Sequence, residues 1–278
     1  MKDREALKKK QKIVVKVGSS TIVHEETGNV DYAKLERLVR ILCDIKNQGK
    51  DVILVSSGAI GVGFKSLGLS RKPKTLSLKQ ACAAVGQGQL MMIYQKLFSE
   101  YHQMAAQVLL TKRVLTNDKR RMNVVNTFQE LLQLDVIPVV NENDTVSTHE
   151  IEFGDNDTLS AVVASLVGAD LLILLSDIDG LFTDDPRKNQ KATLIPTVPK
   201  ITEEILAMAK DTNTGLGTGG MVTKFHAATI ANRSGCDMVI ANGKDVTVLQ
   251  DILAGKEVGT LFLREQEKNF DMKEFLND

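Results

Sequence analysis

The sequence predicts a three-layer α/β/α sandwich with a mainly parallel central sheet. Three observations predict it: apolar runs without polar alternation, helix-periodic segments between them, and polar or glycine-rich clusters directly after several runs. Runs without alternation indicate strands covered on both faces, as in a parallel sheet. Alternation of strands with helices favours helical layers on both sides of that sheet. The chain has 278 residues, 43% of them hydrophobic, which is enough for a sizeable core.

The expected elements follow one another along the chain. The first strand is expected at 12–17 and ends at Gly18. A helix is expected within 32–49, between the start signal Asp31 and the stop signal Gly49. Its apolar face comprises Leu35, Leu38, Val39, Leu42 and Ile45. Further strands are expected at 51–57, 105–110, 136–141, 171–176 and 238–242. Further helices are expected through the 80s and 90s and at 119–134, 157–167, 202–210 and 220–234, and a small exposed hairpin at 147–154.

Charge and cysteine content narrow the class of protein. Lys and Arg together number 35, as do Asp and Glu, so there is no electrostatic case for nucleic acid or membrane as a main partner. Cys43, Cys82 and Cys236 form no CxxC pair, which favours a reducing compartment and argues against a disulfide frame or zinc site. Residues 1–11 form a charged extension without the apolar core of a signal peptide, and no run approaches bilayer length. We therefore expect a cytoplasmic protein.

Polar clusters follow four of the expected strands: KVGSS (16–20), SSGAIG (56–61), NENDT (141–145) and SDIDG (176–180). Ligands of open α/β sheets bind outside the carboxyl ends of the strands. A single cluster is explained equally well by the usual composition of α/β loops. Four clusters in register favour one composite ligand site.

The segment GLGTGGMVTK (215–224) puts four glycines before an expected helix. A flexible, donor-rich loop before a helix N-terminus is suited to bind an anion, although it can also be a mobile connector. No GxxxxGK[ST] motif is present, and neither GQG (86–88) nor GLGTGG (215–220) forms a GxGxxG turn between a strand and a helix. HEETG (24–28) is not HExxH. None of the four histidines pairs convincingly with a nucleophile, and His226 is expected to be structural. Metalloprotease and triad-hydrolase functions are therefore poorly supported.

Several motifs together resemble the glutamate 5-kinases of the amino acid kinase family, from about Lys12 to Phe262. The motifs are IVVKVGSS, VSSGAIGVG, LKQACAAVGQGQL, IPVVNENDTV, FGDNDTLSA, LLLSDIDGLFTDDPR, GLGTGGMVTKFHAA and VGTLF. NENDTV followed by GDNDTLSA is closer to this group than to acetylglutamate kinase, aspartokinase or uridylate kinase. The resemblance implies the amino acid kinase fold and the reaction of ATP with L-glutamate to give L-glutamyl 5-phosphate, the first step of proline biosynthesis.

The resemblance also implies domain limits and partners. The catalytic domain is expected at 12–265, followed by a tail at 266–278. Many bacterial relatives carry a C-terminal PUA domain, which we do not expect because the chain ends just beyond VGTLF. The implied cofactors are ATP and Mg²⁺. Proline as feedback inhibitor, a homo-oligomer and functional coupling to glutamyl-phosphate reductase are further implications.

The chemistry of this reaction fits the residues. The glutamate side chain, with a pKa of about 4.3, is already ionised at neutral pH, so no general base is required. Catalysis then depends on positioning and on positive charge near the phosphates. Lys16 interrupts an otherwise buried strand, and Lys224 lies at a helix start, where the macrodipole disfavours a cation. Such local violations are expected at functional sites.

By resemblance, Lys16 and Lys224 contact the transferring phosphoryl group and Asp157 holds both lysines. Asp157 is also a candidate helix N-cap, and Asp155 is a candidate Mg²⁺ ligand, although Mg²⁺ is expected to be held mainly by the ATP phosphates. The residues expected to bind glutamate are Ser57, Asp144 and Asn156. The residues expected to bind ATP are Lys16, Ser176, Asp177, Thr218, Gly219, Gly220, Met221, Val222, Thr223 and Lys224, with loop 180–187 near the phosphates.

Two alternatives remain open at the level of sequence. The chain could phosphorylate another amino acid of the same family, acetylglutamate or aspartate. It could also be a catalytically silent nucleotide or amino-acid sensor. The intact set of Lys16, Asp157 and Lys224 argues against the sensor.

Overall fold

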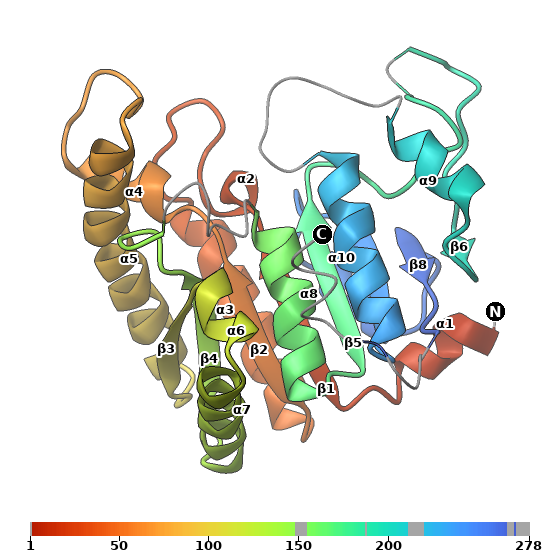
Figure 1. The fold of residues 1–278 in the computed structure, drawn as a ribbon, viewed down its shortest axis with the longest axis horizontal. Coiled ribbons are helices and arrows are strands. Elements are labelled where there is room, and N and C mark those ends of the chain that lie inside the picture. The colour runs from red at the N-terminus through yellow and green to blue at the C-terminus, as the bar shows by residue number, and fades with distance from the viewer. Residues whose placement is uncertain (1, 148–154, 187, 211–219, 266–269, 271–278) are drawn as a thin grey trace. The chain divides into compact units, whose positions relative to one another are not determined.

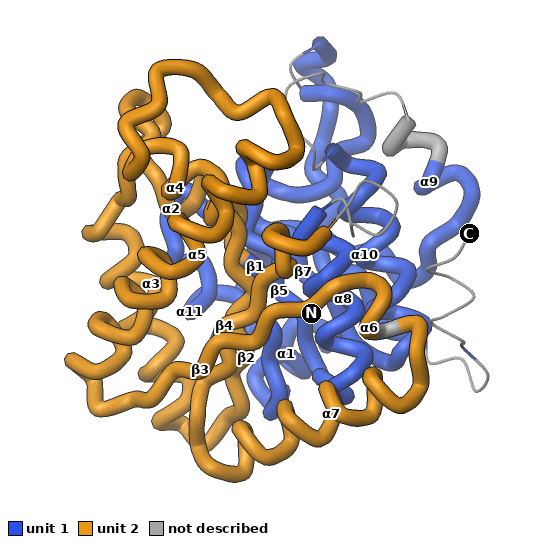
Figure 2. The backbone as a smooth tube through the Cα atoms, turned by 60° about the vertical axis from the view of Figure 1, so that its left-hand side comes forward, with its two compact units in different colours: residues 1–16, 154–278 blue, residues 17–153 orange. Residues whose placement is uncertain are grey.

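The computed structural model describes residues 2–147, 155–186, 188–210, 220–265 and 270. The chain divides into two compact units: unit 1 comprises 1–16 and 154–278, and unit 2 comprises 17–153 (Figure 2). In the described residues, eight strands are hydrogen-bonded in the order β3-β4-β2-β1-β5-β7-β8-β6. The fold is an α/β sandwich with a mostly parallel sheet, as the sequence predicted.

Unit 2 has a parallel set of strands: β2 (Asp51–Ser56), β3 (Ala105–Leu110) and β4 (Ile137–Glu142). Strand β4 pairs with β2 and with β3, with Val55 opposite Val140 and Leu109 opposite Asn141. The helices of this unit are α2 (Ser19–Ile22), α3 (Tyr32–Asn47), α4 (Ala59–Ser66), α5 (Leu76–Ser99), α6 (Lys112–Thr116) and α7 (Asp118–Gln133). Helices α3 and α5 cover one face of the strands and α7 covers the other (Figure 2).

Unit 1 contains the strands β1 (Lys12–Val17, up to Lys16), β5 (Leu171–Ser176), β6 (Thr197–Val198), β7 (Asp237–Asn242) and β8 (Thr260–Phe262). Strand β7 runs parallel to β5 and antiparallel to β8. Its helices are α1 (Lys2–Leu7), α8 (Asn156–Val167), α9 (Glu203–Lys210), α10 (Met221–Arg233) and α11 (Val248–Leu253). Helices α8 and α10 pack side by side over β5 and β7 (Figure 1). Their N-termini lie at the carboxyl ends of these strands, which is where the candidate site is built.

Burial explains why the apolar runs became strands. All six residues of β5 are buried, and so are the last five of β1, Lys16 included. The six expected strands are therefore confirmed, each within one residue of its predicted bounds. The expected hairpin at 147–154 lies outside the described residues except for Ser147.

The N-terminal segment is helical where the sequence indicated a charged extension. Arg4 and Leu7 of α1 are buried. The Arg4 guanidinium donates to the carbonyls of Pro196, Val258 and Gly259 at 2.5–2.9 Å. The start of the catalytic domain at residue 12 stays a prediction, although α1 belongs to the same compact unit as the strands that follow it. Residues 266–269 and 271–278 of the expected tail lie outside the described residues.

Two further observations bear on the predicted class. No helix in the described part of the chain combines the length and hydrophobicity needed to cross a membrane. Cys43, Cys82 and Cys236 are all buried free thiols.

Candidate active site

A buried carboxylate with two ammonium groups lies at the start of α8. Asp157 is 2% exposed; its Oδ1 lies 2.7 Å from Lys16 Nζ and its Oδ2 lies 3.2 Å from Lys224 Nζ. The Thr223 hydroxyl donates to the same Oδ2 at 3.2 Å. Lys16 comes from β1, and Lys224 from the first turn of α10. The structure thus brings together the three residues that the sequence singled out as catalytic, here called the Lys16–Asp157–Lys224 cluster.

The two ammonium groups keep the Asp157 carboxylate ionised. Burial on its own would raise the pKa of Asp157, but the ammonium groups of Lys16 and Lys224 hold it below its ordinary value. Two cations and one anion leave a net positive charge. A buried cationic cluster of this kind favours the approach of a polyanion such as a triphosphate.

Asp155, not Asp157, caps α8. Its carboxylate accepts the Thr158 N–H at 2.8 Å and the Thr158 hydroxyl at 3.0 Å. The expectation that Asp157 is also the cap is wrong, because Asp157 is the second residue of α8 and its side chain pairs with the lysines. Burial raises the pKa of Asp155, opposed by the Thr158 N–H and reinforced by the negative charge of Asp157. The Thr158 hydroxyl also lies 3.3 Å from Nδ1 of His226, which ties α10 to this cap.

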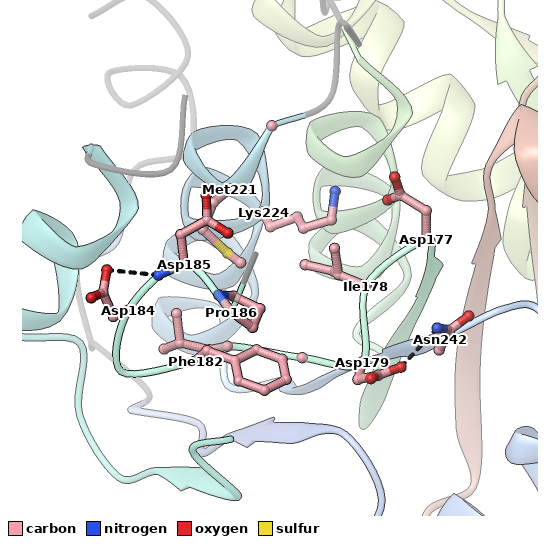
Figure 3. A pocket seen from close by; sticks show the side chains of 13 residues that line it. Asp177, Ile178, Asp179, Phe182, Asp184, Asp185, Pro186, Met221, Lys224 and Asn242 are labelled. Atoms are coloured by element: carbon pink, nitrogen blue, oxygen red, sulfur yellow. Dashed lines mark hydrogen bonds between the residues drawn. The ribbon is translucent and has the colours of Figure 1, made fainter. Parts of the chain in front are cut away.

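A pocket of about 290 Å³ adjoins Lys224 in unit 1 (Figure 3). It is lined by Asp177, Ile178, Asp179, Gly180, Leu181, Phe182, Asp184, Asp185, Pro186, Gly220, Met221, Lys224 and Asn242. Figure 3 shows Lys224 extending from α10 toward the loop that carries Asp177 and Ile178. The lining mixes apolar side chains with polar and charged ones, among them four aspartates and Lys224. A concave site with convergent polar groups is typical of small-ligand sites.

Five of the eight described residues that are expected to bind ATP lie at or beside this pocket. Asp177, Gly220, Met221 and Lys224 line it. Ser176 is buried at the end of β5 and donates to Asp177 Oδ1 at 3.0 Å. Lys16 and Thr223 contact Asp157 instead, and the side chain of Val222 is half exposed. Thr218 and Gly219 lie outside the described residues.

The structure adds Asn242 to the candidate site. Its Nδ2 donates to Asp179 Oδ1 at 2.7 Å, and its Oδ1 accepts the Lys244 N–H at 2.9 Å. Asn242 ends β7 directly opposite Ser176 of β5. The rule that ligands bind at the carboxyl ends of strands applies to β7 as well, so it could have identified this residue.

Two of the three expected glutamate-binding residues lie at one edge of unit 2. Ser57 follows β2 and Asp144 follows β4, and these strands are parallel neighbours. The Ser57 N–H donates to Val17 O at 3.1 Å. Gly58, next in the chain, has a φ of 101°, and a Cβ there would lie 2.5 Å from Ile22 Cδ1. Asn156, the third, is the first residue of α8 in unit 1.

Comparison with known proteins places this geometry in a family. The sequence model of the amino acid kinase family matches residues 11–242. The chain therefore belongs to the amino acid kinase family. Within it, the chain is similar to proteins named glutamate 5-kinase. It is 56% identical to the one from Carboxydothermus hydrogenoformans, over 96% of this chain and 72% of the relative. It is 51% identical to the one from Clostridium perfringens, over 95% and 99%.

Solved structures of distant relatives share the fold. Carbamate kinase from Giardia lamblia bound to AMP-PNP matches with a TM-score of 0.64 at 17% identity, over 92% of this chain and 99% of that one. Isopentenyl phosphate kinase from T. acidophilum matches with a TM-score of 0.63 at 19% identity, over 91% and 100%. At these identities the likeness concerns the fold alone.

Proposed function

We propose that this chain transfers the γ-phosphoryl group of ATP to the side-chain carboxylate of L-glutamate, giving ADP and L-glutamyl 5-phosphate. The observation that carries the proposal is the Lys16–Asp157–Lys224 cluster beside the pocket of unit 1. The similarity to glutamate 5-kinases over nearly the whole chain supports glutamate as the acceptor. The reaction is the first step of proline biosynthesis.

The acceptor needs no activation by a base. A free glutamate carboxylate has a pKa of about 4.3 and is ionised at neutral pH. The barrier is instead the repulsion between this anion and the triphosphate. Phosphoryl transfer is catalysed mainly by positioning and by stabilising charge on the transferring group. A buried pair of lysines supplies that charge.

In this proposal Lys16 and Lys224 contact the transferring phosphoryl group, and Asp157 holds their ammonium groups in place. ATP occupies the pocket of unit 1, with its phosphates near the first-turn N–H groups of α10 that follow Gly220. Thr218 and Gly219 are proposed to extend this phosphate site. The ATP phosphates would hold Mg²⁺ for the most part, a mode that requires only one or two protein carboxylates. Asp155 fits that role, because each of its oxygens accepts one hydrogen bond and retains a lone pair.

Ser57, Asp144 and Asn156 are proposed to bind glutamate. Asp144 would pair with the α-ammonium group in a charge-assisted hydrogen bond. Ser57 and the Gly58 N–H would bind the γ-carboxylate, and Asn156 the α-groups. Ser57 and Asp144 share one edge of unit 2, which supports their joint assignment.

The reaction is tested by trapping its product with hydroxylamine, because an acyl phosphate yields a hydroxamate. Purified protein with ATP and Mg²⁺ should form hydroxamate that depends on L-glutamate. Turnover of N-acetylglutamate or aspartate in its place would move the chain to another acid of the family. Binding of ATP without turnover of any of these acids would favour a silent sensor.

The acceptor site is tested by Asp144→Asn, which keeps the size of the side chain and removes its charge. Loss of a hydrogen bond to a charged group costs about 1.5–3 kcal/mol, so KM for glutamate should rise more than about 10-fold. KM for ATP should stay near wild type, since ATP is bound elsewhere. An unchanged KM for glutamate would remove Asp144 from the acceptor site.

Four accompanying properties are part of the same proposal. The protein is cytoplasmic and forms a homo-oligomer. Proline inhibits it as the end product. It is functionally coupled to glutamyl-phosphate reductase, which consumes the acyl phosphate. Light scattering of the purified protein and proline titration of the hydroxamate assay test the oligomer and the inhibition.

A further inference from the structure

Three polar side chains recur at seven-residue intervals along α5: Gln80, Gln87 and Tyr94. An α-helix has about 3.6 residues per turn, so this spacing places them on one face. Two of them belong to the motif LKQACAAVGQGQL, to which neither catalysis nor ATP binding assigns a role. All three belong to unit 2, as do Ser57 and Asp144.

Gln80 and Gln87 contact the two ends of the loop that carries Asp144. Gln80 Nε2 donates to the carbonyl of buried Ser147 at 3.1 Å. Gln87 Oε1 accepts from Asn141 Nδ2 at 2.8 Å. The orientation of the Asn141 amide is fixed because its Oδ1 accepts the Glu142 N–H at 2.9 Å. The loop between Asn141 and Ser147 is therefore held from α5 on both sides.

Tyr94 holds the segment that carries Ser57. Its hydroxyl lies 2.8 Å from Ser56 Oγ, and both side chains are buried. The Ser56 hydroxyl also donates to Ser57 O at 3.2 Å. Burial raises the pKa of Tyr94, so the phenol stays protonated. Tyr94 thus reaches the backbone of Ser57 through one hydroxyl group.

Helix α5 is itself fixed against α4, the helix that begins after Ser57 and Gly58. A Cβ on Gly63 would lie 1.8 Å from Cys82 O, and one on Gly86 would lie 1.8 Å from Ala59 O. The two helix backbones therefore meet without side chains between them. Such a contact leaves α5 little freedom to shift, so the polar side chains on its face are held in fixed positions.

We propose that Gln80, Gln87 and Tyr94 are positioning residues that set the acceptor-binding geometry of Asp144 and Ser57. The inference rests on the proposed function, since it takes glutamate as the ligand of those two residues. The α5 face touches the segments on both sides of Asp144 and the residue before Ser57, so its effect on the reaction passes through them.

The test compares three variants with two controls in the hydroxamate assay. Gln80→Ala, Gln87→Ala and Tyr94→Phe each remove one contact of the α5 face. Gln95→Ala removes an exposed glutamine of the same helix, and Tyr101→Phe removes a hydroxyl that donates to Glu36. Gln80→Ala, Gln87→Ala and Tyr94→Phe should each raise KM for glutamate by about 3- to 10-fold, the effect of losing one neutral hydrogen bond. In these three variants, kcat and KM for ATP should be nearly unchanged. Both controls should match wild type.

Hydrogen exchange supplies a readout that does not depend on turnover. The N–H groups of Val146 and Ser147 donate to Asn143 O, both at 3.1 Å, and should exchange faster in Gln80→Ala and Gln87→Ala. The Ser57 N–H should exchange faster in Tyr94→Phe. Unchanged exchange, or faster exchange with an unchanged KM for glutamate, overturns the positioning role while wild-type activity stands. A wild-type protein that forms no hydroxamate instead overturns the proposed function, and with it glutamate as the ligand.

Discussion

Replacing Lys224 by alanine tests whether the buried cluster acts in the transition state. Lys224 is 4% exposed and lies 3.2 Å from Asp157, which keeps Lys16 and the Thr223 hydroxyl as partners after the change. Asp157 is therefore not left as an unpaired buried charge. The variant should remain folded, so that a loss of activity reports on chemistry.

The size of the effect follows from the role of a preorganised charge. Removing one such donor costs about 2.7–4 kcal/mol of transition-state stabilisation, or roughly 10²–10³ in kcat. KM for ATP and for glutamate should change much less. Lys224→Arg should rescue only part of the loss, since a planar guanidinium does not replace a compact ammonium without moving its neighbours. Lys16→Ala should show the same pattern.

Asp157 couples the two lysines, so the double variant Lys16→Ala with Lys224→Ala is informative about both activity and stability. When the losses of kcat are expressed as activation free energies, the loss in the double variant should be smaller than the sum of the two single losses. The difference, which is the coupling free energy, should be about 0.5–3 kcal/mol. The loss of unfolding free energy in the double variant should exceed the sum of the two single losses, because Asp157 is then buried without an ion partner, at a cost of about 3–5 kcal/mol.

The assay is steady-state hydroxamate formation with ATP and glutamate varied in turn, accompanied by urea unfolding. Lys256→Ala is the matched control, because Lys256 pairs with Asp251 at the exposed surface. If Lys224→Ala raises KM for ATP and leaves kcat unchanged, Lys224 only tethers ground-state ATP and the transition-state role is refuted. Additive losses of kcat in the double variant would contradict the coupling through Asp157.

Three further predictions concern stability. Asp157→Asn should cost about 3–5 kcal/mol of unfolding free energy at neutral pH, since it removes the buried carboxylate with which Lys16 and Lys224 pair. The lysines hold the pKa of Asp157 in the folded state below its unfolded value of about 3.9. The stability difference between wild type and Asp157→Asn should therefore be fully present above about pH 3.9 and shrink as the pH falls through the folded-state pKa. Urea unfolding at a series of pH values measures this difference. Asp155→Asn retains a good helix cap. Because folding raises the pKa of Asp155, the ionised carboxylate lowers the stability of the wild type at neutral pH, so the variant should melt no lower than wild type there. Any gain in melting temperature should vanish below about pH 4, where the carboxyl is protonated in the unfolded chain as well. Asp155→Ala loses the cap and should be less stable than wild type by about 1 kcal/mol, and calorimetry of both Asp155 variants measures these differences. Gly86→Ala should cost about 1–3 kcal/mol in thermal unfolding, because its Cβ meets Ala59 O. Gly88→Ala, in open space on the same helix, should be neutral or stabilising; equal stability of the two alanine variants would contradict the close contact.

The central strands could be predicted because a strand that is buried on both faces has a continuous run of apolar residues. Strands β6 and β8 escaped prediction, since they have two and three residues and owe their existence to pairing partners distant in sequence. Helix α4 escaped as well, because AIGVGFKS contains two glycines, which usually indicate a turn. Gly63 is tolerated there because the backbone of α5 lies where its side chain would be.

The candidate site was predictable where residues break local rules. A lysine in a buried strand and a lysine at a helix start identified Lys16 and Lys224, whereas Asp157 was assigned by resemblance to the family. The choice between Asp155 and Asp157 as helix cap was not predictable, because two aspartates separated by one residue fit the same sequence pattern and only the position of the helix start decides. The contacts of Gln80, Gln87 and Tyr94 join α5 to separate strand ends, so helical spacing alone did not identify them.

The direct backbone contact between α4 and α5 restricts how the acceptor range of this protein can be changed. No larger side chain fits at Gly63 or Gly86, so directed evolution has no volume to vary between these helices. Thr145 and Val146, in the loop that carries Asp144, are exposed and free of that constraint. A library aimed at longer or shorter dicarboxylic amino acids should therefore diversify the loop and leave the helix pair unaltered.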